Sequence, residues 1–147
     1  MPEKKTLERA RTDARQGKSP STQAGEFVRE EIEHVRQGKH GVRSPQQAIA
    51  IALSKARRAG VPLEPPAPGE AKESTRKSAE RDYHKGHAGK KGTARRYSRS
   101  NEGALKREPR DTVSHQALSQ QARRAAGRRN RSRKNTAGVA NRRPEAA

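Results

Sequence analysis

The clearest helix signal in the sequence is SPQQAIAIALSKARRAG, residues 44–60. Ser44 can cap the first turn, and Gln47 three residues later completes a Ser-x-x-Gln capping box. Pro45 falls at the first helical position, where its missing N–H does no harm. Apolar residues then recur at helical spacing until a glycine stops the helix. We therefore predict a helix at about residues 44–59.

Two further helices are expected upstream, at about residues 6–16 and 21–37. The second is amphipathic, since its apolar residues recur at helical spacing; they are Ala24, Phe27, Val28, Ile32 and Val35. A short link joins it to the helix at 44–59, which favours a helical hairpin. We predict a mostly α protein in which residues 1–61 form a hairpin or three-helix head. This core is thin, so the head could also form a homodimer.

The remainder of the chain is poor in large apolar side chains. Leu, Ile, Val and Phe number only 15 of the 147 residues, and charged residues make up 35%. Such a composition buries too little surface to offset the entropy lost on ordering. We expect residues 62–111 to be a disordered linker and residues 128–147 a disordered basic tail. Between them, residues 112–127 could form one more helix, capped by Thr112 or Ser114.

The net charge of +19 is the main functional signal. Clustered Lys and Arg attract phosphate, and binding releases the counterions condensed on nucleic acid. We predict contacts to the nucleic-acid backbone from two basic regions of the chain. The residues expected to make them are Arg123, Arg124, Arg128, Arg129, Arg131, Arg133, Lys134, Arg142 and Arg143 near the C-terminus, and Lys90, Lys91, Arg95 and Arg96 in the linker. Double-stranded DNA is the expected partner, in preference to RNA.

The helix at 44–59 could also contribute contacts from the head. Polar residues lie away from its apolar stripe, and Gln47 near its start could reach adenine edges. The candidate contacts are Arg43, Gln47, Arg57 and Arg58. A solvated surface is the alternative interpretation of this face, because the preceding link is longer than the turn of a typical helix-turn-helix.

Residues 19–61 resemble a group of small basic bacterial proteins labelled DNA-binding or plasmid-stabilisation. The resemblance rests on STQAGEFVREE, residues 21–31, and RSPQQAIAIALSKARRAG, residues 43–60. It covers under a third of the chain. It implies nucleic-acid binding and no catalytic residues.

Several functions have no support in the sequence. There is no cysteine, so thiolate chemistry and disulfides are excluded. We find no nucleophile with a paired base and no phosphate-cradling glycine motif, and expect no enzyme and no cofactor. His84 and His87 form an H-x-x-H pair without a third ligand, so no metal site is predicted. No stretch approaches the about 20 apolar residues of a membrane span, and we expect a cytoplasmic protein of the bacterial nucleoid.

The sequence therefore predicts a non-enzymatic, largely sequence-independent DNA-binding protein of the nucleoid-associated or DNA-maintenance type. One alternative is an RNA- or ribosome-associated protein, in which Tyr83 and Tyr97 stack on unpaired bases. The other alternative is a protein-interaction module with an accessory basic tail. In that case the head would bind its partner through the side of Ile51 or through an acidic surface formed by Glu26, Glu30, Glu31 and Glu33.

Overall fold

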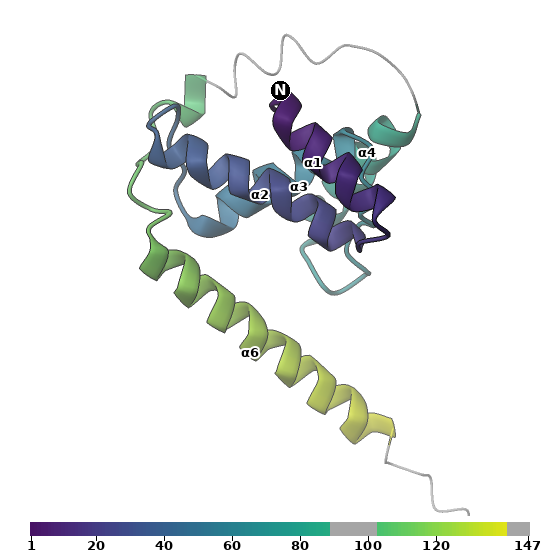
Figure 1. Ribbon diagram of the computed structural model, residues 1–147. Helices are drawn as coiled ribbons and strands as arrows, with labels where there is room; N and C mark the ends of the chain where they lie inside the picture. Colours follow the sequence, from purple (N-terminus) through teal and green to yellow (C-terminus); the bar gives the residue numbers. More distant parts are fainter. Residues whose placement is uncertain (89–102, 141–147) are drawn as a thin grey trace, which may run out of the picture. The chain divides into compact units, whose positions relative to one another are not determined.

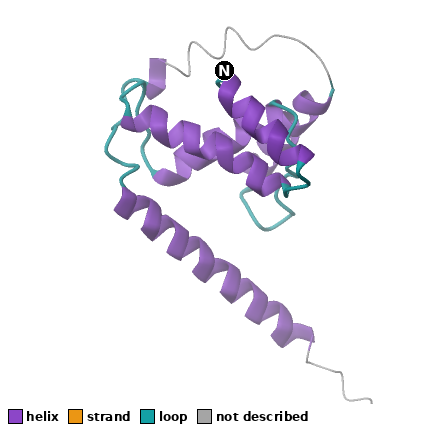
Figure 2. Ribbon diagram, in the orientation of Figure 1, coloured by secondary structure: helices purple, strands orange, loops and turns teal. Residues whose placement is uncertain are grey.

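The computed structural model describes residues 1–88 and 103–140, which contain helices and no strand (Figure 1, Figure 2). The helices are α1 (Lys4–Arg15), α2 (Pro20–Arg36), α3 (Pro45–Arg58), α4 (Glu73–His87) and α6 (His115–Ala140). The chain divides into two compact units, Met1–Val113 and Ser114–Ala147. The mostly α fold class is confirmed, and the first unit extends well beyond the head predicted at residues 1–61.

Ser-Pro pairs begin both α2 and α3. The Ser19 hydroxyl accepts a hydrogen bond from the N–H of Thr22 at 3.3 Å, and the Ser44 hydroxyl accepts one from Gln47 at 3.2 Å. In each helix the proline takes the first turn, where it costs no hydrogen bond. Gln47 Oε1 accepts the N–H of Arg43, one residue before the cap, at 2.7 Å. These caps explain why α3 begins where the sequence predicts.

A glycine with positive φ ends α2 and turns the chain back. Gly38 has φ 72°, a region that side chains with a Cβ enter at a cost. Its N–H donates to the carbonyl of Val35 at 3.0 Å, and the N–H of Lys39 donates to that of His34 at 2.9 Å. This Schellman pair satisfies the last carbonyls of α2. It also sets the direction of the link between α2 and α3, which carries His40.

Two small apolar clusters form the core of the first unit. Helix α2 packs against both α1 and α3, and α3 also packs against α4 (Figure 1). The first cluster contains Ala10, Ala24, Phe27, Ala52, Ala56 and Val61, with Leu7, Val28, Leu53 and Leu63 partly buried around it. The second contains Val35, Val42, Ala48 and Val113, flanked by Ile32 and Ile51. The alanines allow α2 and α3 to approach closely, as the hairpin prediction required.

The prediction of a structureless linker at residues 62–111 is wrong for residues 73–87, which form α4. This helix buries only Ala79 and Asp82, so it lacks the apolar stripe that identifies a packed helix. Polar contacts dock it instead. Asp82 accepts hydrogen bonds from Ser54 at 2.5 Å and from Arg58 at 2.7 Å, both on α3. Close backbone packing adds to this, since a Cβ at Gly86 would collide with the carbonyl of Arg57.

The linker prediction also fails for residues 103–111, which together with Thr112 and Val113 pack against the link between α2 and α3. The N–H of Gly41 donates to the carbonyl of Leu105 at 2.8 Å, and the N–H of Val42 donates to that of Pro109 at 2.7 Å. The hydroxyl of Thr112 donates to the carbonyl of Val42 at 2.6 Å. Val113, expected in the helix at 112–127, is buried in the second core cluster instead. Residues 89–102 of the predicted linker lie outside the described residues.

The second unit contains the helix predicted at residues 112–127. It begins at His115, after Ser114 accepts a hydrogen bond from the N–H of Ala117 at 3.2 Å. It runs on to Ala140, into the segment predicted as a disordered tail. Residues 128–134 contain four arginines and a lysine, which are among the better helix formers and favour the extension.

Replacing Gly41 with alanine should destabilise the first unit. The added Cβ would meet the carbonyl of Glu108, and neither backbone can move without losing hydrogen bonds. We expect a loss of about 1–3 kcal/mol in the free energy of unfolding, measured by urea denaturation. Gly25→Ala in α2 is the matched control, because nothing lies within 4 Å of its Cβ. Gly25→Ala should raise the free energy of unfolding by about 0.5–1 kcal/mol. Equal changes in the two variants would contradict the packing of residues 103–113.

Asp82→Asn should loosen α4. The side chain of Asp82 is 11% exposed, and the substitution removes the charge that pairs with Arg58. We expect the free energy of unfolding to fall by about 1–2 kcal/mol and amide hydrogen exchange along α4 to become faster. The control is Glu80→Gln on the same helix. Glu80 forms a partly exposed ion pair with Arg76 at 3.6 Å. Its loss should lower the free energy of unfolding by less than about 0.5 kcal/mol. Unchanged exchange in Asp82→Asn would mean that these contacts do not dock α4.

Candidate nucleic-acid interface

Helix α6 is rich in basic residues and contains no acidic residue. The stretch His115–Ala140 contains six arginines and one lysine but no Asp or Glu. All six arginine side chains are exposed; they are Arg123, Arg124, Arg128, Arg129, Arg131 and Arg133. A helix of this kind presents a dense, rigidly spaced array of cations to its surroundings.

The spacing of the arginines places five of the six on two sides of α6. Arg124, Arg128 and Arg131 follow one another at intervals of four and three residues, so they lie along one side. Arg129 and Arg133, four residues apart, lie along another. At about 1.5 Å per residue, the basic stretch from Arg123 to Arg133 is about 15 Å long. Duplex DNA carries one negative charge per about 1.7 Å of its axis, so several phosphates fall within this length.

Repulsion between the like charges of α6 makes the stability of this helix depend on bound polyanions. Arginines four residues apart on a helix repel one another by a few tenths of a kcal/mol per pair. Two such pairs occur in α6, Arg124–Arg128 and Arg129–Arg133. Phosphate oxygens between the guanidinium groups would remove this repulsion and form charge-assisted hydrogen bonds. Binding a polyanion should therefore stabilise the helix.

Other predicted backbone contacts cannot be placed. Lys134 belongs to α6, and its side chain is not described. Six more lie outside the described residues: Lys90, Lys91, Arg95, Arg96, Arg142 and Arg143. The described part of the predicted interface is therefore the arginine series of α6.

The candidate contacts of the head have other roles. Arg57 is buried, and its guanidinium donates to the carbonyls of Leu63 at 3.1 Å and Glu64 at 3.2 Å. Burial lowers the pKa of Arg57, and nearby Asp82 partly opposes this shift. Its assignment as a surface contact is wrong, because it ties the segment after α3 to that helix. A buried arginine cannot be recognised from the sequence, which shows only an arginine near a helix end.

The three other head candidates are engaged within the first unit. Arg58 pairs with Asp82, which lies on α4 and covers part of the proposed recognition face of α3. Arg43 is exposed but pairs with Glu108 at 2.6 Å. Gln47 accepts the N–H of Arg43. The structure brings none of the four into an open cationic surface.

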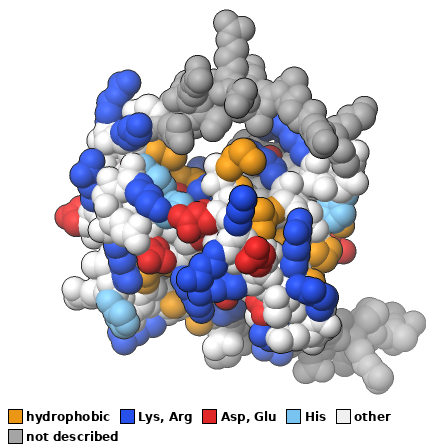
Figure 3. All heavy atoms as spheres, turned by 45° about the horizontal axis from the view of Figure 1, so that its top comes forward, with side chains coloured by type: hydrophobic (Ala, Val, Ile, Leu, Met, Phe, Trp, Pro, Cys, Tyr) orange, Lys and Arg blue, Asp and Glu red, His pale blue; other side chains and the backbone are white. Residues whose placement is uncertain are grey.

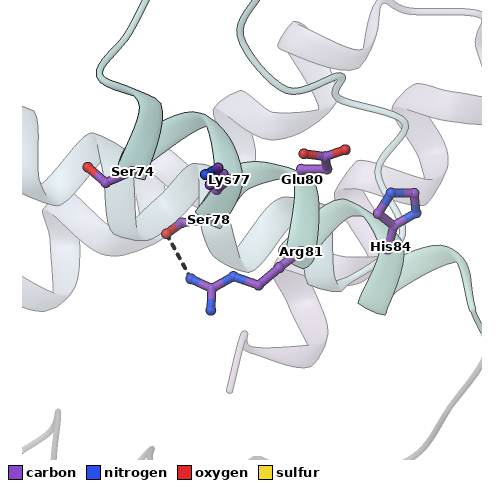
Figure 4. A pocket seen from close by; sticks show the side chains of 6 residues that line it. All are labelled: Ser74, Lys77, Ser78, Glu80, Arg81 and His84. Carbon is purple, nitrogen blue, oxygen red and sulfur yellow. Dashed lines mark hydrogen bonds between the residues drawn. The ribbon is translucent and has the colours of Figure 1, made fainter.

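Elsewhere, the surface of the first unit mixes the two signs of charge. On the face shown in Figure 3, acidic side chains lie between Lys and Arg side chains. A groove of about 570 Å³ runs along α4 and is lined by Ser74, Lys77, Ser78, Glu80, Arg81 and His84 (Figure 4). Within it Arg81 donates to Ser78 at 3.0 Å. All its lining residues come from one helix, so it is a shallow polar surface rather than an enclosed active site.

The aromatic residue of α4 does not offer a free stacking surface. Tyr83 is half-buried, and its ring stacks on that of His87 with centroids 4.1 Å apart. His87 also bonds through Nδ1 to the carbonyl of Tyr83 at 2.8 Å. Tyr97, the second tyrosine of the RNA hypothesis, lies outside the described residues.

The structure brings together one group of metal-type ligands that the sequence does not predict. Glu31 and His34 of α2 and His40 of the following link each offer a ligand atom, all within 4.8 Å of one another. Glu30 and Glu31, predicted on an exposed acidic surface, are 5% and 0% exposed. That assignment is wrong because the link carrying His40 folds back over Glu31, and the backbone of Glu3 donates to Glu30 at 3.1 Å. In the sequence, the i,i+3 spacing of Glu31 and His34 indicates that these two side chains lie on one side of a helix. The approach of His40 to them depends on the turn at Gly38, which the spacing does not reveal.

Comparison with protein-family models, curated proteins and solved structures finds no match for this chain. The family resemblance drawn from residues 19–61 therefore stays a prediction. Among the described residues, no helix combines the length and the apolar character needed to cross a membrane.

Proposed function

We propose that this protein is a non-enzymatic nucleic-acid-binding protein that grips the phosphate backbone of double-stranded DNA through α6, largely without regard to sequence. The observation that carries the proposal is the series of exposed arginines on a helix free of acidic residues. Arginine forms bidentate hydrogen bonds with phosphate, and its positive charge persists at any physiological pH. Contacts of this kind fix a protein on DNA without reading its bases.

The arrangement of charge favours α6 over the first unit as the binding element. In Met1–Val113, many cations are held by carboxylates, including Lys18 by Asp13, Arg43 by Glu108, Lys55 by Glu31 and Arg58 by Asp82. A paired cation must give up its partner before it can bind phosphate. The described arginines of α6 have no carboxylate on their own helix to give up. Phosphate should therefore bind to α6 in preference to the first unit.

DNA is preferred to RNA in this proposal for two reasons. The described tyrosine, Tyr83, already stacks on His87, so it is not poised to stack on an unpaired base. A straight helix with two basic sides also suits the regular phosphate rows of a duplex. Competition between duplex DNA and single-stranded RNA for the full-length protein tests this preference. Stronger competition by RNA, abolished by Tyr83→Ala, would favour the RNA-binding alternative.

Removing three arginines from one side of α6 should weaken DNA binding and flatten its salt dependence. We expect the triple variant R124Q/R128Q/R131Q to bind a short labelled duplex more weakly, as measured by fluorescence anisotropy over a series of salt concentrations. Each lost phosphate contact lowers the slope of log Kobs against log salt by about 0.9, or about 2.7 for three. Two duplexes of unrelated sequence should give the same result.

The matched control removes the same charge from the first unit. Lys5, Arg11 and Arg15 are exposed on α1, so K5Q/R11Q/R15Q has the same net charge as the α6 variant. This control should keep nearly all of the affinity and the salt slope. Equal weakening in both variants would show that binding follows the total charge of the chain, and it would exclude α6 as the interface.

A further inference from the structure

The side of α2 that faces the link to α3 contains a buried carboxylate oxygen without a hydrogen bond. The Glu31 side chain is 1% exposed, and Lys55 donates to its Oε2 at 2.6 Å. No described residue donates a hydrogen bond to its Oε1. A buried charged oxygen left in this state costs free energy, since its water has been removed and not replaced. Oε1 therefore lacks the partner that a buried carboxylate oxygen ordinarily has.

Two histidines converge on this side of Glu31. Nε2 of His40 lies 3.3 Å from Glu31 Oε1, without hydrogen-bond geometry. His34 lies one helical turn after Glu31, and its ligand atom is within 4.8 Å of the other two. In a tetrahedral zinc site with bonds of about 2.0–2.1 Å, two ligand atoms are about 3.3 Å apart. The separation of the Glu31 and His40 atoms is therefore that of two ligands sharing one ion.

The second nitrogen of each histidine is oriented by a neighbouring acceptor. Nε2 of His34 is 2.9 Å from Glu3 Oε1, and Nδ1 of His40 is 3.3 Å from the carbonyl of Gly41. A carboxylate and a carbonyl only accept, so these nitrogens donate, and in the neutral form of each ring Nδ1 of His34 and Nε2 of His40 carry the lone pairs. Metal-binding histidines in proteins are held in the same way, by a carboxylate or carbonyl behind the ring.

Neighbouring charges complete the environment of this cluster. Glu30 is buried beside His34, with its own unpartnered Oε1 4.0 Å from His34 Nδ1. Glu3 Oε1 lies 2.9 Å from His34 Nε2 and accepts a hydrogen bond from Lys39 at 3.0 Å. Lys39 and Lys55 are the cations close by, and each is paired with a carboxylate. The carboxylates of Glu3, Glu30 and Glu31 together outnumber these two ammonium groups, so the cluster can accept further positive charge.

We propose that Glu31, His34 and His40 bind one divalent transition-metal ion, with Zn²⁺ as the best fit to two imidazoles and one carboxylate. A solvent molecule would take the fourth position, since the two histidine side chains are 12% and 14% exposed. The ion would join α2 to the link that carries His40, and so fix the second core cluster at Val35 and Val42. This inference concerns the first unit and does not depend on DNA binding by α6.

Titration of the chelator-treated, full-length protein with ZnCl₂ tests the proposal. Calorimetry should show one ion per chain, and thermal unfolding should shift upward with Zn²⁺ because the ion binds only the folded site. His40→Gln and Glu31→Gln should each weaken Zn²⁺ binding at least about tenfold, since even loss of an outer-shell partner costs that much. The control His84→Gln removes a histidine from α4 and should bind Zn²⁺ as the wild type does.

Two results would overturn the metal site. Absence of one-to-one binding by the folded wild-type protein is the first, and it would leave the cluster as a set of ion pairs with protonated histidines. The second is stoichiometric binding that His84→Gln abolishes and His40→Gln does not, which would move the ion to the H-x-x-H pair of α4. Circular dichroism of each variant without metal shows whether it is folded, and the titration of His84→Gln decides between the two sites if a variant of the cluster is not.

Discussion

Pairing between opposite charges determines how this protein can use its large positive charge. In the first unit, cations and carboxylates lie close together and form ion pairs that help to pack the helices, such as Arg58 with Asp82 between α3 and α4. In α6, the same kind of cation has no acid on the helix to meet. In the first arrangement, the cations are neutralised by ion pairs that hold the helices together. The second leaves charge available for a polyanion, and the proposed DNA binding follows from this difference.

The polar contacts matter because the apolar core is small. Phe27 is the only aromatic residue in the two core clusters, and alanines and valines supply most of the rest. Such side chains allow close approach but bury little area each. Backbone hydrogen bonds from the link after α2 to the carbonyls of Leu105 and Pro109, and the Asp82 contacts of α4, therefore contribute structure that the core alone does not provide. The link that they hold in place is the one that brings His40 to Glu31.

The sequence predicts the parts of the fold that local rules control. Ser44, Pro45 and the glycine after the helix locate α3 closely, apolar spacing locates α2, and the arginine series of α6 is visible directly. Helix α4 is missed because Gly86 and Asp82 dock it, and neither residue contributes to an apolar pattern. The role of Arg57 and the burial of Glu31 are missed for a related reason. Arg57 is buried against the carbonyls of Leu63 and Glu64, beyond the end of its own helix. Glu31 is buried against Lys55 and the link that carries His40. Helical spacing predicts neither contact.

Hydrogen exchange with mass spectrometry tests the central claim most directly, since it locates the DNA contact on the unmodified full-length chain. Duplex DNA should slow amide exchange in His115–Ala140, where neutralised arginines stabilise the helix, and leave exchange in α1, α2 and α3 unchanged. Protection in α3 with no change in α6 would contradict it. So would an exchange pattern that DNA does not alter anywhere at low salt.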